Sequence, residues 1–439
     1  MTVHDPNTPF TATCHSPRVR SVATGTDCVI GHDTLRRVDR LVGVPACVLL
    51  TGLRRLGAPA RLRRPAAQEV RRVLFVQLAE SGSMVLADPA MRTVAARSGA
   101  QLYCVTFTAN RASLSLTGTL PDARVFVIRT GSLRELATDA WRLLSWVRRE
   151  RIDTVIDFEL FSRLTAALCL LTGVRRRAGF HRVGGIGLYR GDLYSHPVRF
   201  DPQRHVADNY LRVVEAVLGA GSPPDAALAP RLRLRAVAPD EFAAVRAKLA
   251  ACLPGSMAHH ARLVLINANA SALLPQRRWP QTHFIALARA LLEHDAALRV
   301  LLIGAAEDRP ATAAIAAGVA DPRCVDVAGR FEVAELPALF RLSAAMVSND
   351  SGPAHFAAVT VLPVIVLFGP ETPRLFRPLG NATVVSAGLA CSPCVHVGNQ
   401  RRTRCSDNQC MKRISVAEVL AATCAVLDAP PQGERTAPV

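Results

Sequence analysis

The chain has 439 residues, of which 50% are hydrophobic and 20% are charged. This composition excludes an intrinsically disordered, collagen-like or coiled-coil protein, and the length predicts about two or three domains. The net charge of +18 comes almost wholly from arginine, because Lys248 and Lys412 are the only lysines. Such an excess of positive charge is expected for a protein that binds nucleic acid. It is equally expected for an enzyme that binds phosphates or lies against an anionic membrane surface.

Residues 1–69 are predicted to form an N-terminal extension, and residues 1–33, which are polar and aperiodic, are expected to be disordered. These residues lack the apolar core of a signal peptide, and twelve cysteines are too sparse for a disulfide scaffold, so we expect a protein of the reducing cytoplasm. The apolar run from Leu41 to Leu53 is shorter than the ~17–25 residues that span a bilayer. We therefore expect no transmembrane helix.

The apolar run of the extension is flanked on both sides by arginines. The flanking residues are Arg36, Arg37, Arg40, Arg54, Arg55, Arg61, Arg63 and Arg64. This is the pattern of a helix that lies in a membrane interface. A helix packed on the protein's own surface explains it equally well, because amphipathic and buried segments of this length look alike.

From residue 70 onward, short apolar runs alternate with helical stretches. The runs are residues 73–78, 101–107, 123–129 and 153–159, and then 262–268, 298–304, 324–329, 344–350 and 363–369. Such alternation is typical of parallel sheets with helices on both faces, so the predicted class is α/β. A stretch rich in Pro, Ala and Gly, residues 219–239, separates the two series and predicts a linker.

The two series predict two doubly wound domains in tandem. We place an N-terminal domain at residues 70–235, a C-terminal domain at residues 236–428 and a loose tail at residues 429–439. Ligands of such sheets bind outside the carboxyl ends of the strands, so the cleft between the domains is the expected ligand site.

The most informative stretch is residues 348–373. A predicted strand ends at Asp350, Ser351 and Gly352 make a tight turn, and His355 lies in the first turn of the next helix. The free N–H groups of that helix start, the Ser351 hydroxyl and His355 are suited to a diphosphate. An ordinary strand-to-helix turn is the alternative for these residues taken singly.

At this point the sequence resembles glycosyltransferase family 9, the heptosyltransferases of lipopolysaccharide core assembly and their relatives. The family's Asp-Ser/Thr-Gly-x-x-His signature stands here as Asp350, Ser351, Gly352 and His355, and its Leu-Phe-Gly-Pro as residues 367–370. The family's basic-Trp-Pro core is matched by Arg277, Arg278, Trp279 and Pro280. The resemblance covers about residues 70–428.

The resemblance implies a GT-B fold, in which two Rossmann-like domains face across a cleft, and an inverting transfer of a sugar from a nucleotide donor without a catalytic metal. The implied donor is ADP-heptose, and the implied acceptor is an anionic, lipid-linked saccharide of lipopolysaccharide or related cell-envelope glycan. It implies a peripheral position on the cytoplasmic face of the inner membrane. The implied donor-binding residues are Asn269, Ser271, Arg277, Arg278, Glu307, Asp350, Ser351, Gly352 and His355.

One residue departs from the family pattern at the loop after the first strand. The family usually has an aspartate, the expected catalytic base, where this chain has Ser83, and a serine cannot accept the proton unaided. Glu80 lies on the same loop and is our predicted catalytic base, with Ser83 beside it. Alternatively, Glu80 merely favours the following helix N-terminus through its charge. The protein would then be a non-catalytic relative that binds nucleotide sugars.

Two further hypotheses concern metals and nucleic acid. A four-thiolate zinc site is one hypothesis for Cys391, Cys394, Cys405 and Cys410. The first two cysteines have the spacing of zinc ligands, but the last two are too far apart. We therefore prefer reduced structural thiols to zinc and predict no cofactor. A nucleic-acid partner is not predicted, because aromatic residues make up only 5% of the chain and no binding motif is recognisable.

Overall fold

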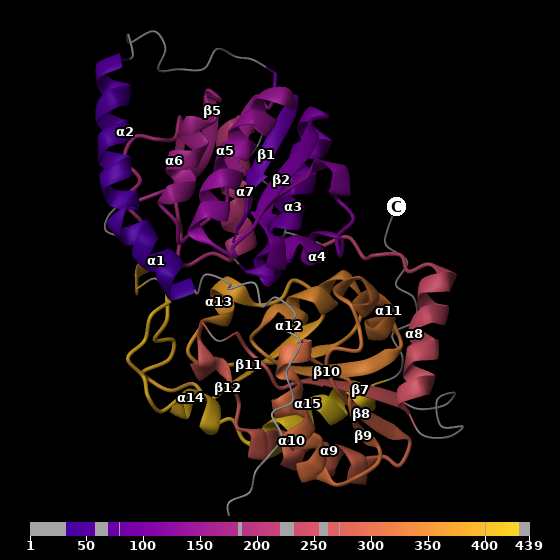
Figure 1. Cartoon of the computed structure of the whole chain (residues 1–439). Helices are drawn as coiled ribbons and strands as arrows, with labels where there is room; N and C mark the ends of the chain where they lie inside the picture. The colour runs from indigo at the N-terminus through magenta and orange to yellow at the C-terminus, as the bar shows by residue number, and fades with distance from the viewer. Residues whose placement is uncertain are drawn as a thin grey trace, which may run out of the picture.

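The computed structural model shows two parallel sheets covered by helices (Figure 1). The described residues are 32–57, 69–78, 80–182, 187–219, 232–253, 262–271, 273–399 and 401–429. Residues 1–31 of the predicted lead, 220–231 of the predicted linker and 430–439 of the predicted tail lie outside the described residues. The predicted α/β class with two doubly wound sheets is confirmed, whereas the domain boundaries stay predictions.

The first sheet has six parallel strands in the order β3-β2-β1-β4-β5-β6. Its strands are β1 (Arg72–Val76), β2 (Gln101–Phe107), β3 (Val125–Ile128), β4 (Thr154–Asp157), β5 (Arg176–His181) and β6 (His196–Arg199). Its helices are α3 (Ser81–Ser98), α4 (Arg111–Leu114), α5 (Leu133–Arg149), α6 (Leu164–Leu171) and α7 (Val206–Leu218).

The second sheet repeats this arrangement in the order β12-β11-β10-β7-β8-β9, again all parallel. Its strands are β7 (Arg262–Asn267), β8 (Leu298–Leu302), β9 (Cys324–Asp326), β10 (Ser343–Asn349), β11 (Val364–Phe368) and β12 (Ala382–Ser386). The helices of this half are α8 (Pro239–Cys252), α9 (Gln281–His294), α10 (Arg309–Val319), α11 (Leu336–Arg341), α12 (Gly352–Phe356), α13 (Pro373–Phe376), α14 (Gln409–Lys412) and α15 (Val416–Leu427).

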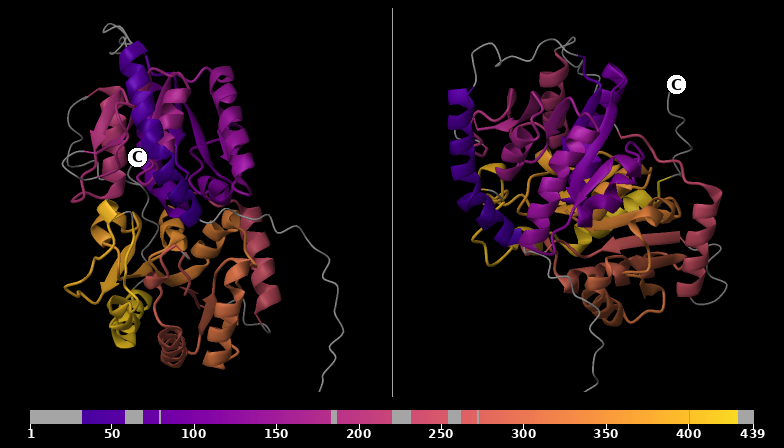
Figure 2. Two further views of the ribbon diagram at one scale, coloured as in Figure 1. Left: turned by 60° about the vertical axis from the view of Figure 1, so that its left-hand side comes forward. Right: turned by 45° about the horizontal axis from the view of Figure 1, so that its top comes forward.

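Strand β1 shows why the strands read as unbroken apolar runs. Val73 and Phe75 belong to the core beneath α3 and α7, whereas Leu74 and Val76 belong to the core that includes side chains of α5 and α6. Because helices cover both faces, as Figure 2 shows from two further sides, successive side chains are buried in both directions. The apolar runs of the sequence follow from this double cover.

Three strands were not anticipated. Strands β5, β6 and β12 lie at or next to a sheet edge, and the first two carry arginine, histidine and proline within short segments, RRAGFH and HPVR. These residues break the apolar pattern, so local sequence gives little signal there.

The strand order places a switch point between β1 and β4 in the first sheet and between β10 and β7 in the second. Connections leave in opposite directions on the two sides of such a point, which opens a crevice at the carboxyl ends of the strands. The loop with Glu80 follows β1, the loop with Asp350 follows β10, and the loop with Arg277 follows β7. The fold therefore brings the predicted site residues to the two crevices.

The N-terminal extension contributes two helices, α1 (His32–Leu41) and α2 (Gly43–Gly57), which run along the outside of the first half (Figure 1). The carboxylate of Asp39 accepts hydrogen bonds from the backbone N–H groups of Arg163 and Leu164 and pairs with the Arg163 guanidinium at 3.0 Å. These bonds attach α1 to the start of α6. In the described part of the chain, no helix combines the length and the hydropathy needed to cross a bilayer.

Candidate functional site

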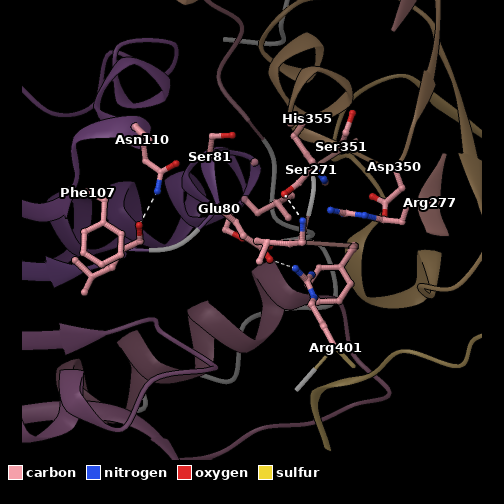
Figure 3. A pocket seen from close by; sticks show the side chains of 18 of the residues that line it. Glu80, Ser81, Phe107, Asn110, Ser271, Arg277, Asp350, Ser351, His355 and Arg401 are labelled. Atoms are coloured by element: carbon pink, nitrogen blue, oxygen red, sulfur yellow. Dashed lines mark hydrogen bonds and ion pairs between the residues drawn. The ribbon is translucent and has the colours of Figure 1, made fainter. Parts of the chain in front are cut away.

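A cavity of about 230 Å³ lies where the two halves of the molecule meet. Its walls come from the loop after β1 and the first turn of α3 on one side, and from the loops after β7 and β10 on the other (Figure 3). Leu35 of α1 also lines it, so the extension contributes to the wall.

The loop after β1 is held by two polar contacts at Leu78. The Asn110 side chain donates a hydrogen bond to the carbonyl of Leu78 at 2.6 Å, and the N–H of Leu78 donates to the Glu159 carboxylate at 2.5 Å. Glu80 follows in a backbone conformation with φ 65° and ψ 108°, in which a residue other than glycine is strained by ~1–3 kcal/mol. The Glu80 side chain accepts no hydrogen bond from the helix that it precedes, because the carboxylate points across the cavity to Arg401.

The start of α3 touches the start of α12 directly. A Cβ atom on Gly82 would lie 2.6 Å from Cδ2 of His355, and a Cβ atom on Gly352 would lie 2.9 Å from Oγ of Ser81. Only glycine permits so close an approach at these two positions. The loop with Glu80 and the Ser351–His355 turn therefore form one surface.

Two buried asparagines fix the loops of the second half. Asn267 at the end of β7 donates a hydrogen bond to Oγ of Ser351 at 2.7 Å, and Asn349 at the end of β10 donates to the carbonyl of Ala268 at 2.8 Å. Oδ1 of Asn349 also accepts from the N–H of Trp279 at 3.1 Å. The loops after β7 and β10 are thereby joined, which brings Arg277 to within 3.6 Å of the Asp350 carboxylate.

Most of the predicted site residues line the cavity. They are Glu80, Ser83, Ser271, Arg277, Asp350, Ser351, Gly352 and His355. Ser83 is buried in the first turn of α3 and hydrogen-bonds the hydroxyl of Tyr210. The roles of these residues stay predictions.

The remaining three predicted residues lie away from the cavity wall. Asn269 donates a weak hydrogen bond to the carbonyl of Ile303 at 3.4 Å, and Arg278 donates to the carbonyl of Ala270 at 2.8 Å. Glu307 is exposed on the short helical turn after β8. Arg278 thus has a structural contact of its own, and Arg277 is the arginine of the pair that faces the cavity.

Arg401 is a cavity residue that the sequence did not reveal. Its guanidinium pairs with the Glu80 carboxylate and lies 2.9 Å from Oε1 of Glu371. It also lies over the rings of Phe376 and Phe161, 4.3 Å and 5.3 Å from their centroids, a favourable arrangement for a desolvated cation. Arg401 has φ 55°, so both partners of the Glu80–Arg401 pair have strained backbones.

Arg401 had no distinctive sequence signal, whereas Glu371 had one in its position. Arg401 lies in a basic loop with several arginines, and the sequence does not indicate which of them is buried. Glu371 directly follows the Leu-Phe-Gly-Pro segment, and this position could have drawn attention to it.

The charges of the site perturb one another. Burial raises the pKa of Glu371 to about 7 even though Arg401 opposes the shift, and burial likewise raises the pKa of Asp350 against the opposing charge of Arg277. Burial would also raise the pKa of Glu80, but Arg401 and Arg277 outweigh it and hold that pKa below its usual value. Glu80 is therefore ionised in the ligand-free protein.

His355 is a neutral group. Burial, followed by the charge of His205, lowers the pKa of His355 to about 3. It can therefore donate or accept a hydrogen bond near neutral pH without adding positive charge to the site.

The four cysteines predicted as structural thiols or zinc ligands lie after β12 and are free thiols. Cys394 lies 3.5 Å from the hydroxyl of Thr403, and Cys405 donates a hydrogen bond to the carbonyl of Asp407 at 3.0 Å. Among the described residues, no group of His, Cys, Asp or Glu side chains is arranged to hold a metal ion.

Comparisons with known proteins agree with the resemblance seen in the sequence. The family model described as glycosyltransferase family 9 (heptosyltransferase) matches residues 140–403. Lipooligosaccharide heptosyltransferase 2 of Haemophilus influenzae is 36% identical over 115 residues, which are 25% of this chain and 33% of that protein. The chain thus matches about a third of the length of this curated relative.

Solved structures extend the similarity to the whole fold. The ADP-heptose LPS heptosyltransferase II of E. coli has a TM-score of 0.62 at 22% identity, covering 81% of this chain and 98% of its own. The E. coli heptosyltransferase WaaC, solved with ADP, has a TM-score of 0.57 at 17% identity, covering 81% of this chain and 99% of its own. The expected GT-B architecture is confirmed by this likeness.

The raised pKa of Glu371 makes a prediction about stability. Below pH 4.5 the carboxyl is protonated in both the folded and the unfolded chain; between pH 4.5 and about 7 only the folded chain keeps the proton. The contribution of this group to stability therefore falls as the pH rises through that window. The Glu371→Gln variant cannot ionise at this position. We therefore expect the melting temperature of the variant minus that of the unsubstituted chain to increase as the pH rises from 4.5 to 7, and to stay constant above pH 7.

Thermal melting across pH 4 to 8 measures this difference. Glu293→Gln, the same substitution at an exposed position of α9, is the matched control. A difference for Glu371→Gln that is constant with pH would show that Glu371 titrates normally.

Proposed function

The chain belongs to glycosyltransferase family 9, and from this premise we propose that it is an inverting glycosyltransferase that moves a heptose from a nucleotide sugar to a lipid-linked saccharide of the cell envelope. The observation that carries the proposal is the meeting of the family's signature residues with Glu80 in one cavity between the two halves. A donor site and a carboxylate must adjoin for one sugar to pass between two bound substrates.

The proposed reaction needs one base and several groups that stabilise negative charge. Glu80 accepts the proton of an acceptor hydroxyl while that oxygen forms a bond to the anomeric carbon from the side opposite the leaving group. The bond from the anomeric carbon to the phosphate oxygen breaks, and its electron pair leaves with the nucleoside diphosphate. Arg277, Ser351 and the N–H groups at Gly352 are the groups that would hold the departing diphosphate.

An adenine nucleotide is the proposed donor carrier. Support comes from the solved relative that contains ADP and from the ADP-heptose named for the other. The proposed acceptor is anionic, in keeping with a chain of net charge +18.

A binding-only function is the second candidate. Ser83 at the position of the family's aspartate favours it, as does the Arg401 guanidinium that occupies the Glu80 carboxylate. The two candidates differ only in turnover.

Calorimetry with ADP, ADP-heptose, UDP-sugars and GDP-sugars tests the donor assignment. We expect ADP-heptose and ADP to bind, and Arg277→Ala to weaken both by ~10-fold or more, because a charge-assisted contact to phosphate is worth ~1.5–3 kcal/mol. Arg341→Ala, an exposed charge-matched control on α11, should bind normally. Failure of every nucleotide to bind would refute the proposal, whereas binding without product from any saccharide acceptor would favour the binding-only candidate.

We also infer that the extension places the protein at the cytoplasmic face of the inner membrane. Half of the exposed large hydrophobic side chains among the described residues lie between residues 41 and 56. Leu49, Leu53 and Leu56 are 63%, 56% and 88% exposed and recur at helical spacing on one face of α2. The opposite face packs inward through Cys47 and Thr51.

The sequence offered two explanations of the apolar run, a helix in a membrane interface and a helix packed on the protein's own surface. We infer that they apply to opposite faces of α2. Arg37 and Arg40 of α1 are exposed, so the extension offers both the apolar area and the positive charge that an anionic bilayer attracts. Arg55 of α2 is also exposed, but its guanidinium pairs with the Asp192 carboxylate. Arg61, Arg63 and Arg64 of the predicted flank lie outside the described residues.

Sedimentation of the full chain with vesicles that contain anionic lipid tests this inference. Leu49→Glu/Leu53→Glu should reduce vesicle binding by ~10-fold or more, because each leucine contributes ~1.5–3 kcal/mol when it is buried in the acyl region. Leu133→Glu/Val361→Glu, at exposed positions of α5 and the loop before β11, is the matched control. Equal loss in both variants, or loss in neither, would reject α2 as the membrane surface.

A further inference from the structure

Arg401 connects the two halves of the molecule through its guanidinium. Glu80 and Phe161 contact it from the first half, and Glu371 and Phe376 from the second. Only 7% of the Arg401 side chain is exposed, yet the residue lines the same cavity as Arg277 and Gly352. It is therefore a cation within reach of a ligand in that cavity.

The present partners of Arg401 conflict with both proposed tasks of the site. A carboxylate that is bound to a guanidinium is a weak proton acceptor, since its charge is already stabilised. A guanidinium that is bound to a carboxylate is likewise unavailable to a phosphate. Breaking the Glu80–Arg401 pair would release both groups at once.

A bound diphosphate supplies a reason for the pair to break. It carries more negative charge than one carboxylate, and the fork of N–H groups on a guanidinium matches two phosphate oxygens. Glu371, of which 1% is exposed, approaches Nε of Arg401 rather than the terminal nitrogen that meets Glu80. The Arg401 side chain can thus keep its Glu371 contact while its terminal nitrogens change partner.

We propose that Arg401 exchanges Glu80 for the diphosphate of the donor, so that donor binding itself frees the catalytic carboxylate. This inference rests on the proposed function and adds to it a reason why the donor must bind before the acceptor is deprotonated. Without donor, the pair keeps Glu80 inactive; with donor, Arg401 joins Arg277 on the phosphates.

The freed carboxylate then acts as described above. The acceptor O–H proton passes to an oxygen of Glu80, the acceptor oxygen bonds to the anomeric carbon, and the anomeric carbon releases the phosphate oxygen with its electron pair. Arg401 is already in contact with the group that gains this charge. In a single movement, the Arg401 guanidinium leaves the base and contacts the leaving group.

ADP affinity, measured by calorimetry on the full chain, tests the exchange without need of an acceptor. We expect Glu80→Gln to bind ADP ~10-fold more tightly than the unsubstituted chain, since Arg401 no longer has to leave a carboxylate; couplings between sites are commonly 5–150-fold. Arg401→Ala should weaken ADP binding by ~10-fold or more. In the Arg401→Ala background, Glu80→Gln should change the affinity by no more than about twofold to threefold, because the competition has been removed.

Two further variants guard against a fold defect. Arg401→Lys keeps a cation that can pair with Glu371 and should bind ADP with intermediate affinity, and Arg402→Ala, at the exposed neighbouring position, should bind ADP normally. Each variant is compared by circular dichroism before titration.

The outcomes separate the exchange from the proposed function. If ADP binds but Glu80→Gln leaves its affinity unchanged, or tightens it equally with and without Arg401, the exchange is wrong and the donor site stands. If neither ADP nor inorganic pyrophosphate binds the unsubstituted chain, the anion site is wrong and the proposed function and the exchange fail together.

Discussion

The arrangement of the site depends on one buried cation, the guanidinium of Arg401, held between the carboxylates of Glu80 and Glu371 and two aromatic rings. A buried arginine needs such partners, because an unpaired charge out of water is costly. The partners come from both halves of the chain, so the same requirement that satisfies the cation also holds the cleft together. It explains, together with Arg277, why Glu80 has a lowered pKa although it is buried. Both residues of the pair also have positive φ angles.

The two sheets supply the frame for this interaction. Each sheet reverses its connection direction at a central pair of strands, and the loops that leave those points carry Glu80, Arg277 and Asp350. Buried asparagines at the ends of β7 and β10 lock two of the loops together. Glycines at positions 82 and 352 then allow the two halves to touch. Rigid loops of this kind suit a site that must hold charged groups at fixed distances.

Local patterns in the sequence were enough to predict the α/β class and the turn from Asp350 to His355, because a strand, a tight turn and a helix start are encoded by adjacent residues. The Glu80–Arg401 pair could not be predicted, since its members lie 321 residues apart and nothing in the sequence around Arg401 distinguishes it from the neighbouring arginines. The raised pKa of Glu371 was equally hidden, because it results from burial that only packing creates. Strands β5 and β6 were missed since polar residues interrupt their short apolar runs.

The position of the Arg401 guanidinium in crystals of the full chain, grown with and without ADP, tests the central interaction most directly. Without nucleotide, we expect it on the Glu80 carboxylate with the Phe161 and Phe376 rings on its faces. With ADP, we expect its terminal nitrogens within hydrogen-bond distance of the diphosphate, its Nε still beside Glu371, and the Glu80 carboxylate turned free into the cavity. ADP bound elsewhere, or bound in the cavity with the Glu80–Arg401 pair intact, would contradict the exchange of partners on which this view of the site rests.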